Sequence, residues 1–441
     1  MTMNLHKISA LALSAALAAS LAGCGANGTA PAEGEARQSA PTVTPSPNGG
    51  EPTAPLQQAR FAPADVDPRL VEAQTRFAFD VYRELSAKEA GNRFFSPISL
   101  SIALAMTMNG AEGETLDAMK RTLSLDSLED DEIQAGYEAL ADVLMRGTDG
   151  IQVALANSLW ADEGVPFREA FLETNRARYD AAVETLDLQS AEATARINGW
   201  VREKTNGKID KLLEEPLAED SILLLLNAIY FDANWASPFR EDRTTVRPFD
   251  GPNGDVDASM MFQEATLPYL DGDGFQAVRL PYAGREASMV VFVPDEGVAL
   301  DDWMKSMDAA QWNRHMNAFA PTHGVVGLPK FKMEQNLPLN DALDNLGMGV
   351  AFDDKAADFS RMTELTGNNA VFLKQVQQKV FVDVQEQGTV AAAVTSVEAG
   401  VTSAPVVSFE LEANRPFFFA IRDDRTGAIL FMGAVYDPTA S

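Results

Sequence analysis

Few residues in this chain of 441 could do covalent or metal chemistry, since it has three histidines and one cysteine. A Ser-His or Cys-His site needs a histidine base. His6 lies in an N-terminal apolar segment, so His315 and His323, on either side of Pro321, are the remaining candidates. The chain also has no G-x-S-x-G, H-E-x-x-H, G-x-x-x-x-G-K-[ST] or G-x-G-x-x-G motif, the patterns typical of acyl-transfer, zinc and nucleotide sites. The sequence therefore predicts no enzyme, no metal site and no cofactor.

The charge balance narrows the class of partner. The chain has 64 acidic and 35 basic residues, for a formal net charge of −29. Such a chain repels a phosphate backbone, so a nucleic-acid partner is not expected. One cysteine also excludes an internal disulfide.

The N-terminus has the pattern of an export signal. Lys7 precedes an apolar run from Ile8 to Leu21, which is too short for a transmembrane span. The run ends in Leu21-Ala22-Gly23-Cys24, which resembles the cleavage box of bacterial lipoproteins. The resemblance implies that residues 1–23 are a signal peptide and that Cys24 is acylated. We expect an exported bacterial lipoprotein at the cell surface or in the outer membrane or periplasm, touching a membrane through its lipid alone; the alternative is an ordinary buried cysteine.

The rest of the chain divides into a tether and one large domain. Residues 24–64 hold seven of the 23 prolines and few large apolar residues, which predicts a disordered tether. Residues 65–439 contain no second break of this kind. Helical spacing at Leu70–Leu85 and Ile98–Met106, with Ser96-Pro97 as a helix start, precedes apolar strand-like runs at Met289–Val293, Pro416–Ile421 and Ile429–Val435. Helices early and strands late predict an α+β domain.

A segment of small residues near the C-terminus is the most informative part of the chain. It has no Lys or Arg between Lys379 and Arg415, and it begins Glu386-Gln387-Gly388-Thr389-Val390-Ala391-Ala392-Ala393. At a period of two residues, Thr389 and Ala391 lie on a face of small uncharged side chains. Such a segment could enter a packed sheet, but its pattern alone fits an edge strand or an Ala-rich loop equally well.

This segment resembles the hinge and reactive-centre loop of the serpin family, and other motifs follow in the family's order. They are Asn92-Arg93-Phe94-Phe95-Ser96-Pro97-Ile98-Ser99, Asn157-Ser158-Leu159-Trp160, Leu226-Asn227-Ala228-Ile229-Tyr230-Phe231 with Trp235, Leu280-Pro281-Tyr282, Leu328-Pro329-Lys330-Phe331, Asp358-Phe359-Ser360, Asn414-Arg415-Pro416-Phe417 and Phe431-Met432-Gly433. The resemblance implies a serpin fold, with several helices packed on three β-sheets and an exposed loop. It also implies a suicide-substrate inhibitor, which traps a serine protease as an acyl complex when its cleaved loop inserts into the main sheet.

Family spacing implies which bond the protease attacks. Fourteen residues after Gly388 stands Thr402, with Ser403 on the leaving side and Val401 as the fallback. Small residues here, and the absence of Lys and Arg, favour an elastase-like or subtilisin-like protease with small-residue specificity as the partner of a monomeric inhibitor.

The resemblance also implies a hinge, a sheet-opening cluster and two upper-sheet contacts. The hinge comprises Glu386, Gly388, Thr389, Val390, Ala391, Ala392 and Ala393, the cluster Ser96, Ser99, Asn227 and Gln378, and the contacts Trp235 and Lys330, with Lys330 paired to Glu386. Two positions depart from the family: Val390 replaces a Glu and Gln378 a His. An amide still donates and accepts hydrogen bonds, so sheet opening should survive. The alternative is a non-inhibitory serpin that acts as a surface-displayed binding or structural module.

Overall fold

The computed structural model describes residues 60–87, 91–146, 150–218, 221–365, 371–390 and 406–440. The predicted signal peptide, Cys24 and nearly all of the predicted tether lie outside these residues. So do three hinge residues and the predicted reactive bond, namely Ala391, Ala392, Ala393, Val401, Thr402 and Ser403.

Most of the longer described helices lie in the first half of the chain, as the sequence predicts. They are α1 (Pro68–Ser86), α2 (Pro97–Met108), α3 (Gly113–Thr122), α4 (Asp130–Met145), α5 (Glu169–Tyr179), α6 (Ala191–Lys204), α7 (Leu300–Met304), α8 (Ala309–Ala318) and α9 (Asn340–Leu343). Ser96 caps α2 by accepting a hydrogen bond from the Ser99 backbone N–H at 3.3 Å, and Pro97 occupies the first turn. Because α2 is apolar on almost every side, it can only be a buried helix.

The described strands form two hydrogen-bonded sheets. The six-stranded sheet has the order β10 (Phe331–Pro338), β11 (Gln377–Val384), β12 (Gly388–Thr389), β4 (Leu223–Asn234), β2 (Ile151–Asp162), β3 (Ala182–Leu186). The other sheet has the order β1 (Arg93–Phe95), β15 (Ile429–Val435), β14 (Phe417–Asp423), β8 (Ala287–Pro294), β7 (Phe275–Pro281), β6 (Gly254–Gly272), β9 (Ala320–Pro329), β13 (Phe409–Glu412), with β5 (Thr245–Gly251) paired to β6.

The number of sheets differs from the three that the sequence predicts, and the length of β6 explains the difference. This strand has 19 residues. Its start pairs with β5, its middle with β9 and its end with β7. One long strand therefore joins β5, β7 and β9 into a single sheet. The α+β class, with helices packed on multiple sheets, is confirmed.

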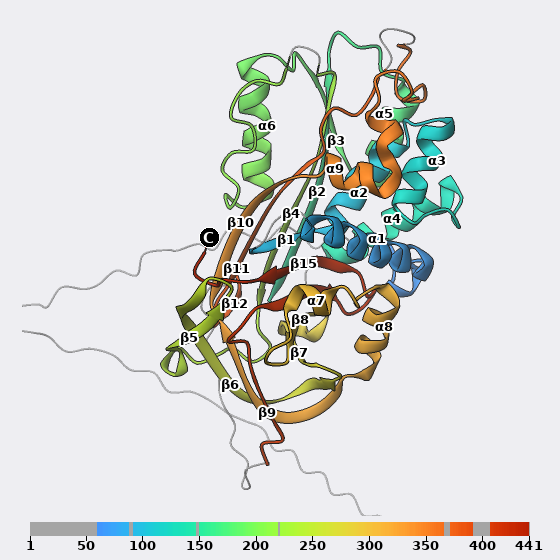
Figure 1. Ribbon diagram of the computed structural model, residues 1–441. Helices are drawn as coiled ribbons and strands as arrows, with labels where there is room; N and C mark the ends of the chain where they lie inside the picture. The colour runs from blue at the N-terminus through green and yellow to red at the C-terminus, as the bar shows by residue number, and fades with distance from the viewer. Residues whose placement is uncertain are drawn as a thin grey trace, which may run out of the picture. The chain divides into compact units, whose positions relative to one another are not determined.

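Helix α2 lies between the two sheets, in contact with β4 of one and β15 of the other (Figure 1). Helix α6 covers the opposite face of the six-stranded sheet, where Trp160 of β2 and Trp200 of α6 meet edge to face at 6.2 Å. Strands β8 and β15 are buried along their whole length. Because both faces of these strands are buried, their sequences are nearly continuous apolar runs. The first turn of α2 is thus placed directly beneath the six-stranded sheet.

No helix in the described part of the chain is long and apolar enough to cross a membrane. The two histidines considered as catalytic bases lie on different elements. His315 is on α8, with its ring centroid 5.0 Å from that of Phe275, and His323 is on β9. Pro321, which separates the two histidines in the sequence, lies within β9. Among the described residues, no group of three His, Cys, Asp or Glu side chains is arranged to hold a metal ion.

Candidate functional site

Two hinge residues already form a strand inside the six-stranded sheet. Thr389 pairs with Val384 of β11 on one side and with Ala233 of β4 on the other, and Gly388 pairs with Asn234 (Figure 1). Elsewhere in the described residues, no pairing joins β11 to β4. We call this unpaired interval, Gln377–Asp383 facing 223–232, the strand gap, and its end at β12 the upper end.

Glycine is required at the start of β12. A Cβ atom at Gly388 would lie 2.0 Å from the Ala233 carbonyl oxygen and 2.7 Å from the Asn234 Cα. Backbone atoms cannot yield as a flexible side chain can, so the close approach of the two chains needs a residue without a side chain. The hinge glycine therefore allows the segment to enter beside β4.

The side chain of Thr389 points into the protein. Thr389 is 1% exposed, and its Oγ1 lies 2.7 Å from the Tyr282 hydroxyl oxygen. Burial raises the pKa of Tyr282, whose ring stacks on Trp235 with centroids 4.5 Å apart. A protonated hydroxyl at this depth makes one specific hydrogen bond, which fixes Thr389 on the inward face.

Backbone hydrogen bonds hold the turn before β12. Trp235 donates from its backbone N–H to the Gln387 carbonyl and from its indole Nε1–H to the Gln385 carbonyl, both at 2.9 Å. Phe239 donates from its backbone N–H to the Glu386 carbonyl, also at 2.9 Å. The segment after β4 therefore acts as a template for the hinge, and Trp235 contacts the upper end of the sheet.

Glu386 joins this template through its carboxylate. Its Oε2 lies 2.8 Å from Lys330 Nζ, and its Oε1 accepts a hydrogen bond from Thr244 Oγ1 at 2.9 Å. Burial alone would raise the pKa of Glu386, but the hydrogen bond from Lys330, a backbone hydrogen bond, Thr244 and the charge of Lys330 together hold it below its usual value. The expected pairing of Lys330 with Glu386 is present.

The four residues of the predicted sheet-opening cluster lie together at the other end of the strand gap. Gln378 of β11 accepts from the Ser96 backbone N–H and donates to the Ser96 carbonyl, both at 2.9 Å. Ser99 Oγ lies 3.5 Å from the Asn227 carbonyl oxygen of β4, and the Asn227 amide donates to Asn157 of β2. The first turn of α2 thus bridges the two strands that border the gap.

The comparisons with known proteins agree with this geometry. Residues 72–438 match the family model described as serpin (serine protease inhibitor). The chain belongs to the serpin family. The family is described as serine protease inhibitors, and such proteins do not themselves catalyse a reaction.

Three similar proteins illustrate the match. A serpin-like protein of Thermococcus kodakarensis is 35% identical over 417 residues, covering 92% of this chain and 95% of that protein. The leukocyte elastase inhibitor of Xenopus laevis is 35% identical over 382 residues, covering 84% of this chain and 99% of that protein. The native-state crystal structure of tengpin, a thermophilic serpin, has a TM-score of 0.76 at 30% identity and covers 84% of this chain and 95% of its own.

The serpin loop leaves the six-stranded sheet at Val390 and returns to the described residues at Val406. Val390 has φ 58°, a left-handed conformation, and its backbone N–H donates to the Asp383 carbonyl at 2.8 Å. Val406 is 81% exposed, and β13 then pairs in parallel with β9. The residues between, 391–405, include the predicted reactive bond.

Two residues of the site had no role in the sequence prediction. Tyr282 stood in a family motif, but nothing in that motif indicated that its hydroxyl would meet Thr389. Thr244 lies in a polar stretch before β5, and no sequence signal connected it with Glu386, 142 residues away. Both contacts join segments more than 100 residues apart, which spacing along the chain does not reveal.

Proposed function

We propose that this serpin is a suicide-substrate inhibitor that traps a serine protease by inserting its cleaved loop into the strand gap. The observation that carries the proposal is β12. Both of its residues pair with β4, and Thr389 pairs with β11 as well, in the direction that an inserted strand would continue. A non-inhibitory module would need no such start.

The energy available is sufficient for trapping. If about 15 residues each gain a net 0.5–1.5 kcal/mol from backbone hydrogen bonds, insertion releases on the order of 10–20 kcal/mol before entropy is subtracted. The sheet must first let β11 and β4 separate further. In the described residues, β12 joins the two strands at the upper end and the first turn of α2 bridges them at the other end.

The proposed reactive bond is Thr402–Ser403, with Val401 as the fallback, and the proposed target has elastase-like or subtilisin-like specificity. Leukocyte elastase inhibitors among the relatives are consistent with small-residue targets. The proposal rests on spacing from Gly388 and on the lack of Lys and Arg from 380 to 414.

Incubation with an elastase-type and with a trypsin-type protease tests the function. The elastase-type enzyme should give an SDS-stable band of summed mass and release a C-terminal fragment that begins at Ser403. If trapping persists but the fragment starts outside residues 402–404, the assignment of the reactive bond is wrong. Cleavage without a stable complex, together with equal melting temperatures of cut and uncut protein, would favour the non-inhibitory module.

We further propose that the protein is an exported lipoprotein anchored through Cys24, with no other membrane contact, and that the serpin domain acts as a monomer. Cys24→Ser should release the protein from the membrane fraction and abolish incorporation of a labelled fatty acid. Retention of both would show that Cys24 is an ordinary cysteine.

A further inference from the structure

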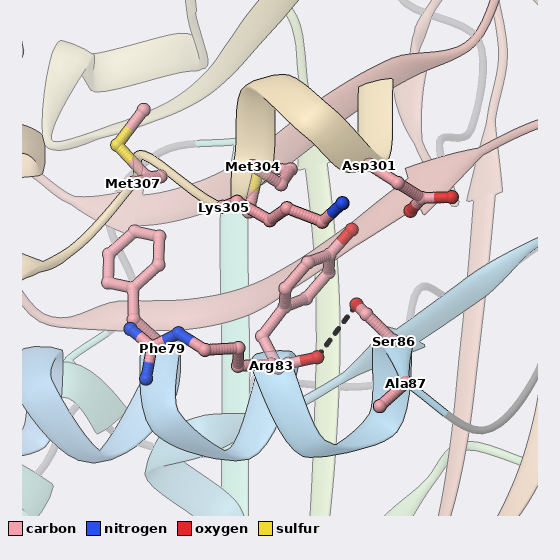
Figure 2. A pocket seen from close by; sticks show the side chains of 9 residues that line it. Phe79, Arg83, Ser86, Ala87, Asp301, Met304, Lys305 and Met307 are labelled. Atoms are coloured by element: carbon pink, nitrogen blue, oxygen red, sulfur yellow. Dashed lines mark hydrogen bonds between the residues drawn. The ribbon is translucent and has the colours of Figure 1, made fainter. Parts of the chain in front are cut away.

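Two exposed valines lie where the reactive-centre loop rejoins the described part of the chain. Val406 is 81% exposed and Val407 41%. Isolated apolar side chains are ordinary on a protein surface, but exposed ones next to each other are candidates for contact with a partner. The cavity between α1 and α7 is different, because the apolar side chains that line it, such as Phe79 and Met304, are already buried by the protein (Figure 2). We call residues 406–408 the loop foot.

Hydrogen bonds and a buried ring hold the loop foot against β9. The Ser408 backbone N–H donates to the His323 carbonyl at 2.8 Å, and the Ser408 hydroxyl donates to the Val406 carbonyl at 3.3 Å. The next residue, Phe409, is 6% exposed and stacks on Tyr269 of β6 with centroids 4.0 Å apart. Because the foot is fixed in this way, covering its two valines with a partner requires little further ordering of the chain.

The surroundings of the loop foot are acidic. Glu410 is exposed and lies two residues after Ser408, and the Glu264 carboxylate lies 3.2 Å from Nε2 of His323. The described strands around the foot, β6, β9 and β13, contain no Lys or Arg. Their acidic residues are Asp255, Asp257, Glu264, Asp271, Glu410 and Glu412. A partner with cationic side chains around an apolar contact would complement this surface.

The loop foot lies close to the bond that a protease is proposed to attack. Val406 follows Thr402 by four residues, a distance of at most about 14 Å in an extended chain. A protease of about 250 residues has a radius of gyration of about 18 Å. The body of a protease whose active site holds Thr402 and Ser403 therefore covers the loop foot. Val390, at the other end of the loop, is twelve residues from Thr402.

We propose that the loop foot, together with the carboxylates of Glu264 and Glu410, is a second docking surface for the target protease. It selects proteases that carry cationic side chains around an apolar contact, on the leaving-group side of the active-site cleft. This rests on the reactive bond proposed above. Because the loop foot lies beyond Ser403, it is not part of the chain that would insert after cleavage. It therefore governs how fast and how tightly a protease binds, and not whether the acyl complex ends in trapping or in hydrolysis.

Binding without cleavage tests the apolar contact directly. The full chain is titrated with an elastase-type protease of net positive charge whose active-site serine is replaced by alanine. The double substitution Val406→Ser with Val407→Ser should weaken binding about tenfold, because it removes the apolar contact without adding a charge. Val246→Ser is the matched control: Val246 is 68% exposed but lies on β5, away from the loop foot, and this variant should bind as the wild type does.

The acidic surroundings are tested separately. Glu410→Lys should slow association about fivefold at low salt and reduce its dependence on salt, because charges at the rim of an interface act mainly on the association rate. Asp255→Lys makes the same change of charge at the opposite end of β6 and should associate as the wild type does. An elastase-type protease of net negative charge should associate at least about tenfold more slowly than the cationic one.

Active protease separates this proposal from the proposed function. The loop-foot double variant should form the SDS-stable complex more slowly than the wild type, but the same fraction of cleaved inhibitor should end in that complex. Cleavage without a stable complex would refute trapping, and the comparison with inactive protease would still decide the docking surface. Equal binding by the double variant and Val246→Ser, equal rates for Glu410→Lys and Asp255→Lys, or no saturable binding of the inactive cationic protease would each overturn the second docking surface.

Discussion

The two ends of the strand gap are held by different chemistry. At the upper end, main chain fills the gap: Thr389 pairs with β11 and β4, and Gly388 pairs with β4. The Trp235 backbone N–H donates a hydrogen bond to the turn before them. At the other end, side chains bridge the gap. The Gln378 amide makes two hydrogen bonds to the Ser96 backbone, and the Ser99 hydroxyl contacts the Asn227 carbonyl. At the upper end a strand has begun to form between β11 and β4. At the other end the first turn of α2 links the two strands.

The difference indicates how insertion would proceed. Backbone pairing has already started at the upper end, so each further residue that enters the gap gains the same kind of hydrogen bonds. The contacts at the other end must break or slide, because a new strand cannot pass while β11 and β4 share the first turn of α2. The upper end would therefore govern how insertion starts, and the cluster at the other end how easily the sheet opens.

The largest effect is expected from a charge at the start of the new strand. Thr389→Arg places a cation where a 1% exposed hydroxyl now meets Tyr282, and desolvating it is costly. The loop should still be cut at the same bond and rate, but the SDS-stable complex should fall below detection. Thr389→Ser, which keeps the hydroxyl, and Val390→Glu, on the outward face, should trap normally. Unchanged stoichiometry for Thr389→Arg would show that the buried, inward position of Thr389 is not needed for trapping.

A somewhat smaller effect is expected from reversing the charge of Glu386, which pairs with Lys330 at the upper end. Glu386→Lys puts two lysines together, removes the bond to Thr244, and should destabilise the upper end by about 3 kcal/mol. Loosened edges of β11 and β4 can then pair with another molecule's loop. Native gels after mild heating should show polymers, and a variant that remained monomeric would contradict the role given to this ion pair.

Acid provides a control for that ion pair. Since the pKa of Glu386 is lowered in the folded protein, its contribution to stability is complete above the unfolded value of about 4.3 and is lost as pH falls through the folded value. Glu386→Gln lacks this contribution at every pH. The difference in melting temperature between wild type and Glu386→Gln should therefore be constant above about pH 5 and shrink below pH 4.

Much of this site was predictable from the sequence, because the order of its motifs fixes the family. Helix starts such as Ser96-Pro97 and runs such as Ile429–Val435 also have local causes that a sequence reader can see. The hydrogen bond between Tyr282 and Thr389 could not be predicted in the same way. It depends on where β12 stops entering the sheet, which is a balance between whole strands and leaves no local pattern. The number of sheets likewise depends on the continuity of β6, which no local sequence pattern indicates.

A moderate effect is expected at the other end of the gap. Gln378→Ala removes both bonds to Ser96 and leaves the buried Ser96 N–H unpaired, while the Ser96 carbonyl keeps its bond from the Leu100 N–H. The free energy of unfolding should fall by about 2 kcal/mol. Because an amide does not titrate, trapping by the wild type should be constant between pH 6 and 8. Gln378→His should trap less well below about pH 6.5, since a protonated ring cannot accept from the Ser96 N–H. Equal pH profiles for the two proteins would show that Gln378 does not control opening.

The smallest effect is expected where β12 ends. Val390 is β-branched and has φ 58°, a conformation that costs such a residue about 1–3 kcal/mol. The strain belongs to the uncleaved form, because an inserted strand would return Val390 to extended backbone, which valine prefers. Val390 therefore adds to the free energy that insertion releases.

Asparagine tolerates the left-handed conformation, so Val390→Asn should stabilise the uncleaved protein by about 1 kcal/mol and slightly destabilise the cleaved form. The measured outcomes are a higher melting temperature before cleavage, a smaller gain on cleavage, and a modest rise in the number of inhibitor molecules consumed per trapped protease. Val390→Ile keeps the β-branching and should match the wild type in all three. If Val390→Asn instead lowers the melting temperature of the uncleaved protein, the strain does not reside at this residue, and the upper end of the gap is held by its pairing and ion pair alone.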